Sequence, residues 1–357
     1  MTSPLFTSFQ VGSLTLPNRM VMAPMTRGRA NSDGSPNELI AQYYKQRATA
    51  GLIVTEATAI SPQGTGWVGA PGIFTDAHVA GWKLVTDAVH QAGGHIFLQL
   101  WHMGRVSHPD FLNGELPVGP SAVAAIGETH TPFGKKSYVT PRALTIDEIK
   151  ATIADYGRAA KLAKQAGFDG VEMHAANGYL IDQFIRDCSN KRTDEYGGSI
   201  ENRVRFLMEA TKAAIAEWSA DRVAVRFSPT SQYNDMSDST AEATFTYASE
   251  RLGELGLAYL HIIEPIAGQM FVAVPPVAPS MRRAFKGTVI VNGGYDAITA
   301  AAAINEGLAD AVAFGVPFLT TPDLVHRFDA GLPLNAPDYS TIHTNGANGF
   351  TDYPVLS

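Results

Sequence analysis

The segment IDEIKATIADYGRAAKLAKQAGFDGVEMH, residues 146–174, contains one complete helix–turn–strand unit. Apolar residues recur at helical spacing from Ile146 to Ala166, and Gly170–His174 has the length of a short buried strand. Gly167 lies between them, where a glycine commonly ends a helix. Because such units build folds with a parallel sheet, this segment predicts an α/β protein.

The same unit recurs along the chain. Eight short strands are predicted, at Met20–Ala23, Leu52–Ala57, His95–Leu100, Gly170–His174, Arg222–Phe227, Ala258–Ile263, Thr288–Asn292 and Ala311–Gly315. Helical stretches alternate with them, at Glu38–Ala50, Val79–Ala92, Ile146–Ala166, Ile200–Glu217, Ala241–Leu255 and Ala297–Glu306. Eight units predict a closed (β/α)8 TIM barrel, a single domain over residues 1–357, rather than an open doubly wound sheet.

Local signals support these boundaries. Thr145 followed by Glu148 predicts a capping box at the start of one helix. Five glycines fall between a helical stretch and the next strand, where a C′ glycine is expected: Gly51, Gly93, Gly167, Gly256 and Gly307. Two segments do not fit the repeat. Ser8–Leu16 resembles a small hairpin that closes the bottom of the barrel, and Met103–Leu144 is a long insertion after the third strand, which we interpret as a lid.

Composition limits the possible functions. Apolar residues make up 45% and charged residues 17% of the chain, as in a globular protein with a large core. The net charge of -7 argues against nucleic acid or an anionic membrane as partner. The N-terminus lacks the features of a secretory signal and no apolar run is long enough to span a membrane, which predicts a cytoplasmic protein.

The single cysteine, Cys188, excludes an intrachain disulfide and is interpreted as a structural thiol. No metal site is predicted, because Glu172 and His174 have no third ligand at useful spacing.

Polar residues and glycines follow the predicted strands at their C-terminal ends, where barrels of this type carry their sites. This set comprises Thr26, Gln99, Trp101, His174, Arg226, Gly293 and Gly294. Each alone has a structural explanation, such as capping a backbone group or pairing with a carboxylate, but together they favour a shared ligand. The glycines in VNGGYD and AFGVPF fit a phosphate-bearing cofactor, although a Gly-Gly pair is equally a tight turn.

Several long motifs occur in one order: APMTRGRA, LIVTEAT, LQLWHMGR, GFDGVEMHAANGYLIDQFIRD, NKRTDEYGGSIENRVRF, VAVRFSP, VNGGY and NGANGFTDYP. With these motifs the chain resembles the Old Yellow Enzyme family of flavin-dependent ene-reductases over nearly its whole length. The resemblance implies an FMN-containing barrel that takes hydride from NADPH or NADH and delivers it to an activated C=C bond of an enone, enal or nitroalkene. Thr26, where another branch of the family has cysteine, is similar to the classical branch.

The resemblance also implies roles for individual residues. FMN contacts are expected at Pro24, Met25, Thr26, Ala57, Gln99, Arg226, Gly293, Gly294, Phe314 and Gly315, and substrate contacts at Trp101, Phe271 and Tyr353. Gln99 would pair with the pyrimidine edge of the flavin, because an amide offers both a donor and an acceptor. Arg226 would stabilise the anionic reduced ring.

The polar residues of MHAANGYLIDQF, residues 173–184, would then form the catalytic group. His174 and Asn177 would donate to one carbonyl or nitro oxygen of the substrate and stabilise the enolate. Tyr179 would protonate the α-carbon as general acid.

One position departs from the family pattern. The family usually has arginine after the last glycine, as FGRPF, where it contacts the FMN phosphate, but this chain has FGVPF with Val316. Valine cannot make that charge-assisted contact, so the sequence leaves open how firmly FMN is held. Two alternatives follow: a flavin-independent barrel lyase or isomerase, and a flavin-binding module with little turnover. The sequence does not determine the oligomeric state, the physiological substrate or the choice between NADPH and NADH.

Overall fold

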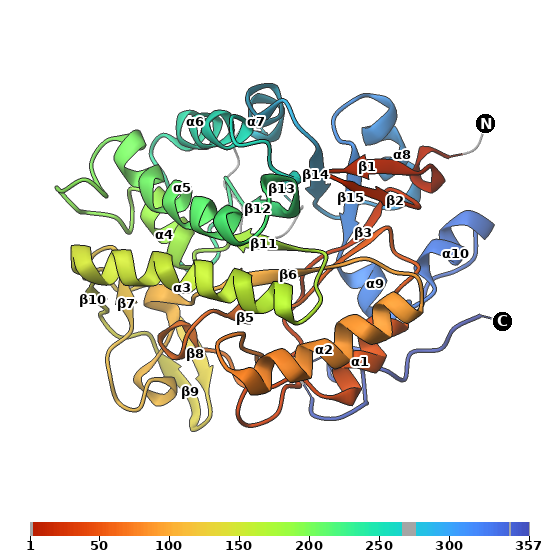
Figure 1. The fold of residues 1–357 in the computed structure, drawn as a ribbon, viewed down its shortest axis with the longest axis horizontal. Helices are drawn as coiled ribbons and strands as arrows, with labels where there is room; N and C mark the ends of the chain where they lie inside the picture. Colours follow the sequence, from red (N-terminus) through yellow and green to blue (C-terminus); the bar gives the residue numbers. More distant parts are fainter. Residues whose placement is uncertain (1–2, 266–275, 343, 357) are drawn as a thin grey trace.

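Eight parallel strands close into a barrel in the computed structural model, which describes residues 3–265, 276–342 and 344–356 (Figure 1). In order around the barrel they are β3 (Met20–Met22), β4 (Leu52–Val54), β6 (Ile96–Trp101), β11 (Gly170–His174), β12 (Val223–Phe227), β13 (Tyr259–Ile263), β14 (Val289–Asn292) and β15 (Ala311–Phe314). The pairing of Phe314 with Met22 joins β15 back to β3. All eight predicted strands and the predicted barrel are therefore confirmed.

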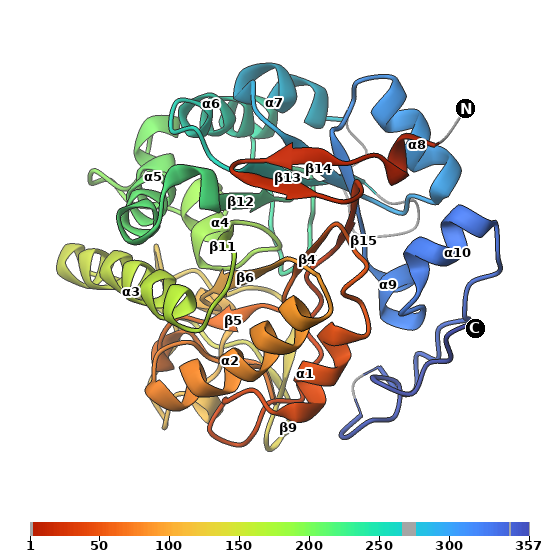
Figure 2. The same ribbon diagram turned by 45° about the vertical axis from the view of Figure 1, so that its right-hand side comes forward.

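Helices surround these strands on the outside (Figure 2). They are α1 (Glu38–Lys45), α2 (Asp76–Gln91), α3 (Ile146–Gln165), α4 (Leu180–Ile185), α5 (Ile200–Glu217), α6 (Ala241–Gly253), α7 (Ala278–Phe285), α8 (Ala297–Asn305), α9 (Val316–Thr320) and α10 (Leu324–Ala330). The predicted capping box is present at the start of α3: the Thr145 hydroxyl accepts from the Glu148 N–H, and the Glu148 carboxylate accepts from the Thr145 N–H. The six predicted helices exist, whereas α4, α7, α9 and α10 were not predicted.

Strand side chains alternate between two cores. Val171 and Met173 of β11 pack outward in the large core that the strands share with the helices. Phe97 and Tyr259 belong to a second core inside the barrel, made of residues from the strands, their ends and the hairpin. Since both faces of each strand are buried, the strands show continuous apolar runs rather than strict alternation.

The predicted helix at Glu38–Ala50 is too long. Helix α1 ends at Lys45, and the chain then passes through short turns in which Ala48 N–H bonds to Lys45 O and Ala50 N–H to Arg47 O. Apolar spacing alone does not distinguish such turns from a continuing helix. The C′ role predicted for Gly51 is also wrong, because its φ is not positive. Gly51 is needed for another reason: a side chain there would collide with the backbone of Asn18.

The predicted N-terminal hairpin is present as β1 (Phe9–Val11) and β2 (Leu14–Leu16), paired antiparallel. Val11 and Leu16 are fully buried and belong to the same inner core as Leu52 and Phe97 near the N-terminal ends of the barrel strands. The hairpin therefore closes the bottom of the barrel and leaves the opposite end for the site.

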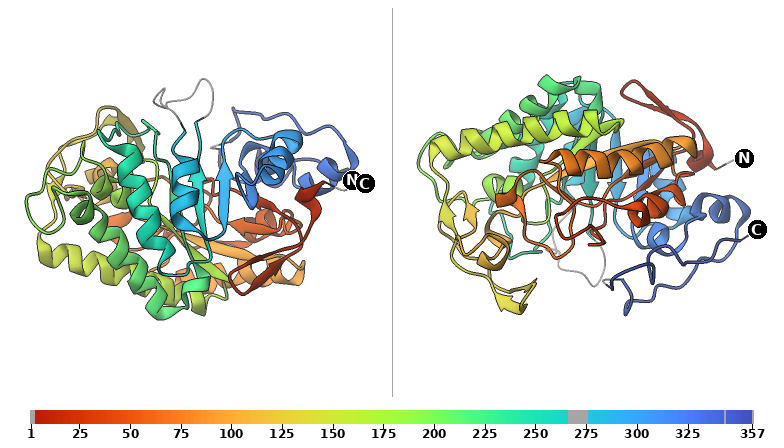
Figure 3. Two further views of the ribbon diagram at one scale, coloured as in Figure 1. Left: turned by 90° about the horizontal axis from the view of Figure 1, so that it is seen from above. Right: turned by 60° about the horizontal axis from the view of Figure 1, so that its bottom comes forward.

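The long insertion lies between β6 and α3, as predicted. It contains β7 (Val118–Gly119), the hairpin of β8 (Glu128–Thr131) and β9 (Gly134–Ser137), and β10 (Arg142–Ala143). The β8–β9 hairpin projects from the body of the molecule (Figure 3). The start of the insertion is fixed by buried Arg105, whose guanidinium donates to the carbonyls of Asn234 and Asp235. Its action as a lid stays a prediction.

Candidate active site

A cavity of about 210 Å³ lies at the C-terminal ends of the strands. The side chains around it come from several strands and loops and include both acid–base and amide groups. They are Pro24, Thr26, Ala57, Trp67, Gln99, His174, Asn177, Tyr179, Arg226 and Tyr233. Eight of these ten were predicted as site residues from the sequence, so the barrel gathers positions that are up to 202 residues apart in the chain.

His174 and Arg226 occupy paired positions on the neighbouring strands β11 and β12. Both are almost fully buried, with exposed fractions of 3% and 5%. Burial, reinforced by the charge of Arg226, lowers the pKa of His174 to about 3, so the imidazole is neutral at physiological pH. Burial also lowers the pKa of Arg226 to about 10, which leaves the guanidinium charged. The cavity therefore has a neutral hydrogen-bonding ring beside a fixed cation.

The loop after β11 holds Asn177 in a left-handed conformation, with φ of 57°. Two hydrogen bonds fix its backbone: Asn177 N–H donates to Ser228 Oγ at 2.8 Å, and Asn234 Nδ2 donates to Asn177 O at 2.8 Å. The next residue is held as well, because Gly178 N–H donates to Asp182 Oδ2 at 2.8 Å. Asparagine tolerates this backbone conformation better than most residues. The loop can thus turn the Asn177 side chain toward the cavity next to His174.

Tyr179 is the N-cap residue of α4 and its side chain lies against two rings. Its ring centroid is 5.0 Å from that of Trp101, edge to face, and 5.0 Å from that of His174. Burial, together with nearby Tyr233 and Tyr138, raises the pKa of Tyr179 well above its usual value. The hydroxyl therefore keeps its proton at physiological pH and is available as a donor.

Below the cavity, Gln99 and Arg226 are held by partners from other strands. Gln99 Nε2 donates to Glu172 Oε1 at 2.8 Å, and Arg226 Nη2 donates to Asn292 Oδ1 at 2.9 Å. Among the described residues, the buried Nε of Arg226 and Nδ1 of His174 have no hydrogen-bond partner. Both atoms belong to side chains that line the cavity. Unpaired buried polar atoms are expected close to a site where a polar ligand binds, which fits the flavin ring of FMN.

The glycines expected to contact phosphate lie on the adjoining strands. Gly293 and Gly294 follow β14, and Gly315 follows β15. Strand β15 pairs with β14 on one side and with β3 on the other. Met25 is beside Gly315, because a side chain on Gly315 would contact its sulfur at 3.6 Å. Phe314 is buried in the large core. None of these five residues lines the 210 Å³ cavity itself.

Val316 begins the five-residue helix α9 and is 42% exposed. The position at which the family usually has arginine is therefore open to solvent in this chain, beside Gly315. An arginine at this position could keep its charge in contact with solvent, so the substitution would not bury a charge.

The three residues predicted to contact substrate have different outcomes. Trp101 is 1% exposed and lines a larger adjoining cavity of about 800 Å³, which shares Trp67 with the smaller one. Tyr353 lines neither of these two cavities; its hydroxyl oxygen accepts from Asp338 N–H. Phe271 lies outside the described residues. Trp101 thus contacts the site through the Tyr179 ring rather than through the smaller cavity.

Sequence reasoning missed two residues of the cavity wall and two of its supports. Trp67 and Tyr233 come from loops with no strand pattern, so nothing in the sequence placed them at the barrel end. Glu172 and Asn292 support Gln99 and Arg226 from below. For Glu172 a signal existed: a carboxylate within a strand that is otherwise buried needs partners inside the barrel.

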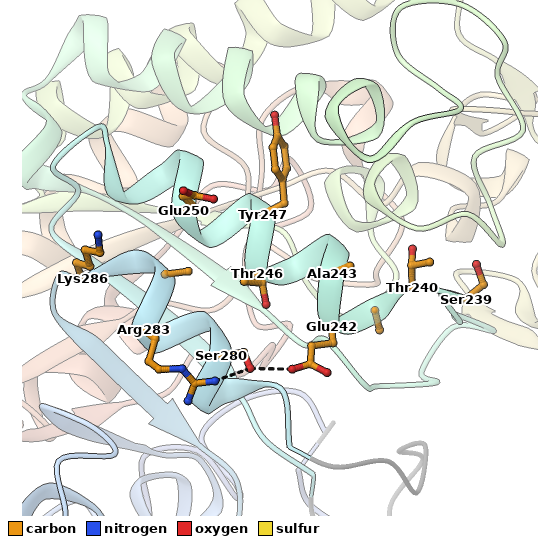
Figure 4. Close-up of a pocket in the computed structure, with 12 residues that line it drawn as sticks. Ser239, Thr240, Glu242, Ala243, Thr246, Tyr247, Glu250, Ser280, Arg283 and Lys286 are labelled. Atoms are coloured by element: carbon orange, nitrogen blue, oxygen red, sulfur yellow. Dashed lines mark hydrogen bonds between the residues drawn. The ribbon is translucent and has the colours of Figure 1, made fainter.

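A larger groove of about 950 Å³ lies elsewhere, between α6 and α7 on the outside of the barrel (Figure 4). Its polar groups pair with each other: Ser280 donates to Glu242 at 2.8 Å and Arg283 donates to Ser280 at 3.0 Å. It shares no residue with the cavity at the strand ends, so the smaller cavity is the better candidate for chemistry.

Within residues 3–265, 276–342 and 344–356, no cluster of His, Cys, Asp or Glu could hold a metal ion, and no helix is long and apolar enough to cross a membrane.

The sequence and the fold match known flavoproteins. Residues 4–335 match the NADH:flavin oxidoreductase / NADH oxidase family. 12-Oxophytodienoate reductase 1 of Oryza sativa subsp. japonica is 44% identical, covering 99% of this chain and 93% of the relative. The solved structure of an Old Yellow Enzyme homologue from Zymomonas mobilis has a TM-score of 0.96 at 48% identity, covering 99% of both chains. Morphinone reductase has a TM-score of 0.96 at 47% identity, covering 100% of this chain and 97% of that one.

The fold and cavity define a flavin-dependent barrel oxidoreductase. The chain belongs to the NADH:flavin oxidoreductase / NADH oxidase family and, as its motifs indicated, to the Old Yellow Enzyme group within it. It is an enzyme of the ene-reductase class, with FMN as cofactor and NAD(P)H as hydride donor.

Proposed function

We propose that the protein reduces the activated C=C bond of small α,β-unsaturated carbonyl or nitro compounds in the cavity at the strand ends. The observation that carries this proposal is that His174, Asn177 and Tyr179 line one cavity, which Arg226 and Gln99 also line. When bound, FMN supplies the hydride that it has received from NAD(P)H. The relatives support the same chemistry by their names, as reductases of oxophytodienoate and morphinone.

His174 and Asn177 are proposed to hold the carbonyl or nitro oxygen of the substrate. Both line the cavity, and burial keeps His174 neutral, so its ring donates a hydrogen bond without placing a second cation beside Arg226. Two donors on one oxygen withdraw electron density from the β-carbon and stabilise the enolate. The rigid loop around Asn177 supports this role, because preorganised donors need no rearrangement as charge develops.

Tyr179 is proposed to be the general acid. The side chain is buried, its raised pKa keeps the hydroxyl protonated, and its ring lies next to that of His174. It would give its proton to the α-carbon as the enolate collapses.

The cofactor is proposed to contact Pro24, Met25, Thr26, Ala57, Gln99, Arg226 and Phe314 around the ring, and Gly293, Gly294 and Gly315 around the phosphate. The fixed charge of Arg226 suits an electron-rich ring, and the amide of Gln99 suits an edge with donors and acceptors. Backbone N–H groups at the glycines suit phosphate.

The visible spectrum of the purified protein tests this function. With FMN bound, anaerobic NADPH or NADH should bleach the flavin band, and 2-cyclohexenone or a nitroalkene should restore it with formation of the saturated product. A protein that is bleached but not restored by any such acceptor would be a flavin-binding module with little turnover. A protein that takes up no FMN on reconstitution would instead require flavin-independent chemistry.

The proposed partners are small molecules alone. The acidic net charge of -7 supports the absence of nucleic acid as a partner. The cytoplasmic location predicted from the sequence is kept as a proposal, supported by a single cysteine that has no second cysteine to pair with.

A further inference from the structure

A buried carboxylate lies directly below the cavity, inside the barrel. Glu172 on β11 is fully buried and accepts three hydrogen bonds. Gln99 Nε2 donates to its Oε1 at 2.8 Å, while Tyr259 Oη at 3.0 Å and His261 Nδ1 at 2.9 Å donate to its Oε2. These donors come from β6 and β13, on either side of β11 and β12. One carboxylate thus links strands that surround the floor of the site.

The charge of Glu172 is balanced by the site above it. Burial opposes ionisation of Glu172, but His261, Arg226 and Gln99 outweigh burial and hold its pKa below the usual value. Burial lowers the pKa of His261, so the ring is neutral and donates its Nδ1 proton to the carboxylate. Close to the cavity, the negative Glu172 and the positive Arg226 are therefore two buried charges of opposite sign that stabilise each other.

The bond to Glu172 also decides how Gln99 faces the cavity. Because the carboxylate accepts one of the two Nε2 hydrogens, the amide nitrogen of Gln99 is directed to Glu172, and the amide oxygen and the second N–H are left for the ligand. Without this acceptor the amide could rotate by half a turn, and donor and acceptor would exchange places.

We propose that Glu172 is a positioning residue for the flavin reaction: it fixes the orientation of the Gln99 amide and, as the counter-charge of Arg226, sets how strongly the site prefers reduced over oxidised FMN. The proposal rests on the proposed placement of FMN in this cavity. Glu172 thus acts in two ways that can be tested separately: it orients the Gln99 amide, and its charge balances that of Arg226.

Two substitutions separate these statements. Glu172→Asp keeps the charge but withdraws it from Gln99 by one methylene, so oxidised FMN should bind about tenfold more weakly, the usual effect of losing one well-made hydrogen bond. Glu172→Gln keeps the shape but removes the negative charge. The reduction potential of bound FMN should then become more positive, equivalent to about tenfold tighter relative binding of the reduced form.

FMN affinity is measured by quenching of flavin fluorescence, and the potential by anaerobic titration against a reference dye. Glu209→Gln is the matched control, because Glu209 also accepts a tyrosine hydrogen bond, from Tyr196 at 2.8 Å, but lies on the outer helix α5. It should leave both quantities within twofold of the wild type. If it shifted them as Glu172→Gln does, the effect would be global and the inference would be lost.

A double substitution tests whether Glu172 acts through Gln99. In a Gln99→Ala background, Glu172→Asp should weaken FMN binding no further, whereas a full additive loss would contradict the inference. If Glu172→Gln does not fold, the FMN affinity of Glu172→Asp decides: an affinity equal to that of the wild type would overturn the orientation role.

Failure of the proposed function would give a different result, because the wild-type protein itself would then bind no FMN. Failure of the inference alone would give a wild type that binds FMN and variants with the same affinity and potential.

Discussion

The two sides of the barrel mouth are built in different ways. On the side of β6, β11 and β12, the polar groups are buried side chains with partners below them, such as Gln99 on Glu172 and Arg226 on Asn292. On the side of β14 and β15, the expected phosphate contacts are backbone groups of glycines, and Val316 is 42% exposed. On the first side, hydrogen bonds fix the positions of the side chains before any ligand binds. On the second side, contacts with a ligand would be made by exposed backbone groups.

This difference indicates where function is sensitive to change. Substitutions on the buried side should alter chemistry strongly, since each group is preorganised and desolvated. Substitutions on the open side should alter cofactor retention, since they add or remove contacts without disturbing the rest.

Replacing Tyr179 with Phe should slow reoxidation of the reduced enzyme by an enone about 10²- to 10⁴-fold, the usual cost of losing a general acid. Flavin reduction by NADPH should change little, because that half-reaction needs no proton from Tyr179. Anaerobic stopped-flow measurement of the two half-reactions checks this. Equal slowing of both would mean that Tyr179 positions the flavin or the substrate instead.

Removing either proposed oxygen-binding group should slow enone reduction by roughly 10²- to 10³-fold. His174→Ala and Asn177→Gly are suitable, because glycine tolerates the φ of 57° at position 177 and alanine would add backbone strain. Both variants should weaken binding of a para-substituted phenolate and raise the apparent pKa of the bound phenol, since the donors stabilise the anion.

The double variant of His174 and Asn177 sharpens this test. If the two side chains share one oxygen, the double variant should lose less than the sum of the single losses. Spectroscopic phenol titrations of the four proteins give the comparison. Full additivity, or an unshifted phenol pKa in both single variants, would show that the side chains act on different atoms.

On the open side, Val316→Arg should tighten FMN binding by about 1.5 to 3 kcal/mol, or roughly 10- to 100-fold, through a charge-assisted contact with phosphate. The matched control is Val355→Arg, since Val355 is also exposed, at 59%, in the C-terminal segment. Fluorescence titration measures both. The same affinity in wild type and Val316→Arg would show that phosphate is held elsewhere.

The last prediction concerns the pH dependence of stability. Burial lowers the pKa of His102 to about 3, and its Nδ1 accepts from Gly104 N–H at 3.0 Å. Between pH 6.5 and 3 the unfolded state binds a proton at this histidine that the folded state does not, so acid destabilises the protein by up to about 1.4 kcal/mol per pH unit per such histidine. His174 contributes in the same direction.

Accordingly, His102→Gln should flatten the slope of unfolding free energy against pH below pH 6.5 by about one proton. Urea unfolding at pH 4.5, 5.5 and 6.5 measures the slope independently of any constant loss of stability. His130→Gln, at an exposed position of the β8–β9 hairpin, is the control and should leave the slope unchanged. An unchanged slope in His102→Gln would mean that this ring binds protons equally in the folded and unfolded states, which would contradict the prediction.

Local sequence signals predicted the barrel well because they act at short range. The capping box at Thr145 and the apolar run of Gly170–His174 need only neighbouring residues to form. The same signals failed at Glu38–Ala50, because a chain of turns keeps helix-like spacing while it returns to the next strand. Likewise, Gly51 is required by the nearby backbone of Asn18, 33 residues earlier, and not by the end of a helix.

The alternation of strands and helices, the family motifs and the end of the barrel at which Thr26, Gln99, His174 and Arg226 meet could all be predicted from the amino-acid sequence. The contacts beneath these residues could not: Glu172 accepts from Gln99, and Trp101 lines an adjoining cavity while Tyr353 lines neither cavity. The two kinds of information act over different distances along the chain. Helix and strand periodicity arises between residues a few positions apart, whereas hydrogen bonds inside a barrel join side chains that only closure of the sheet brings together.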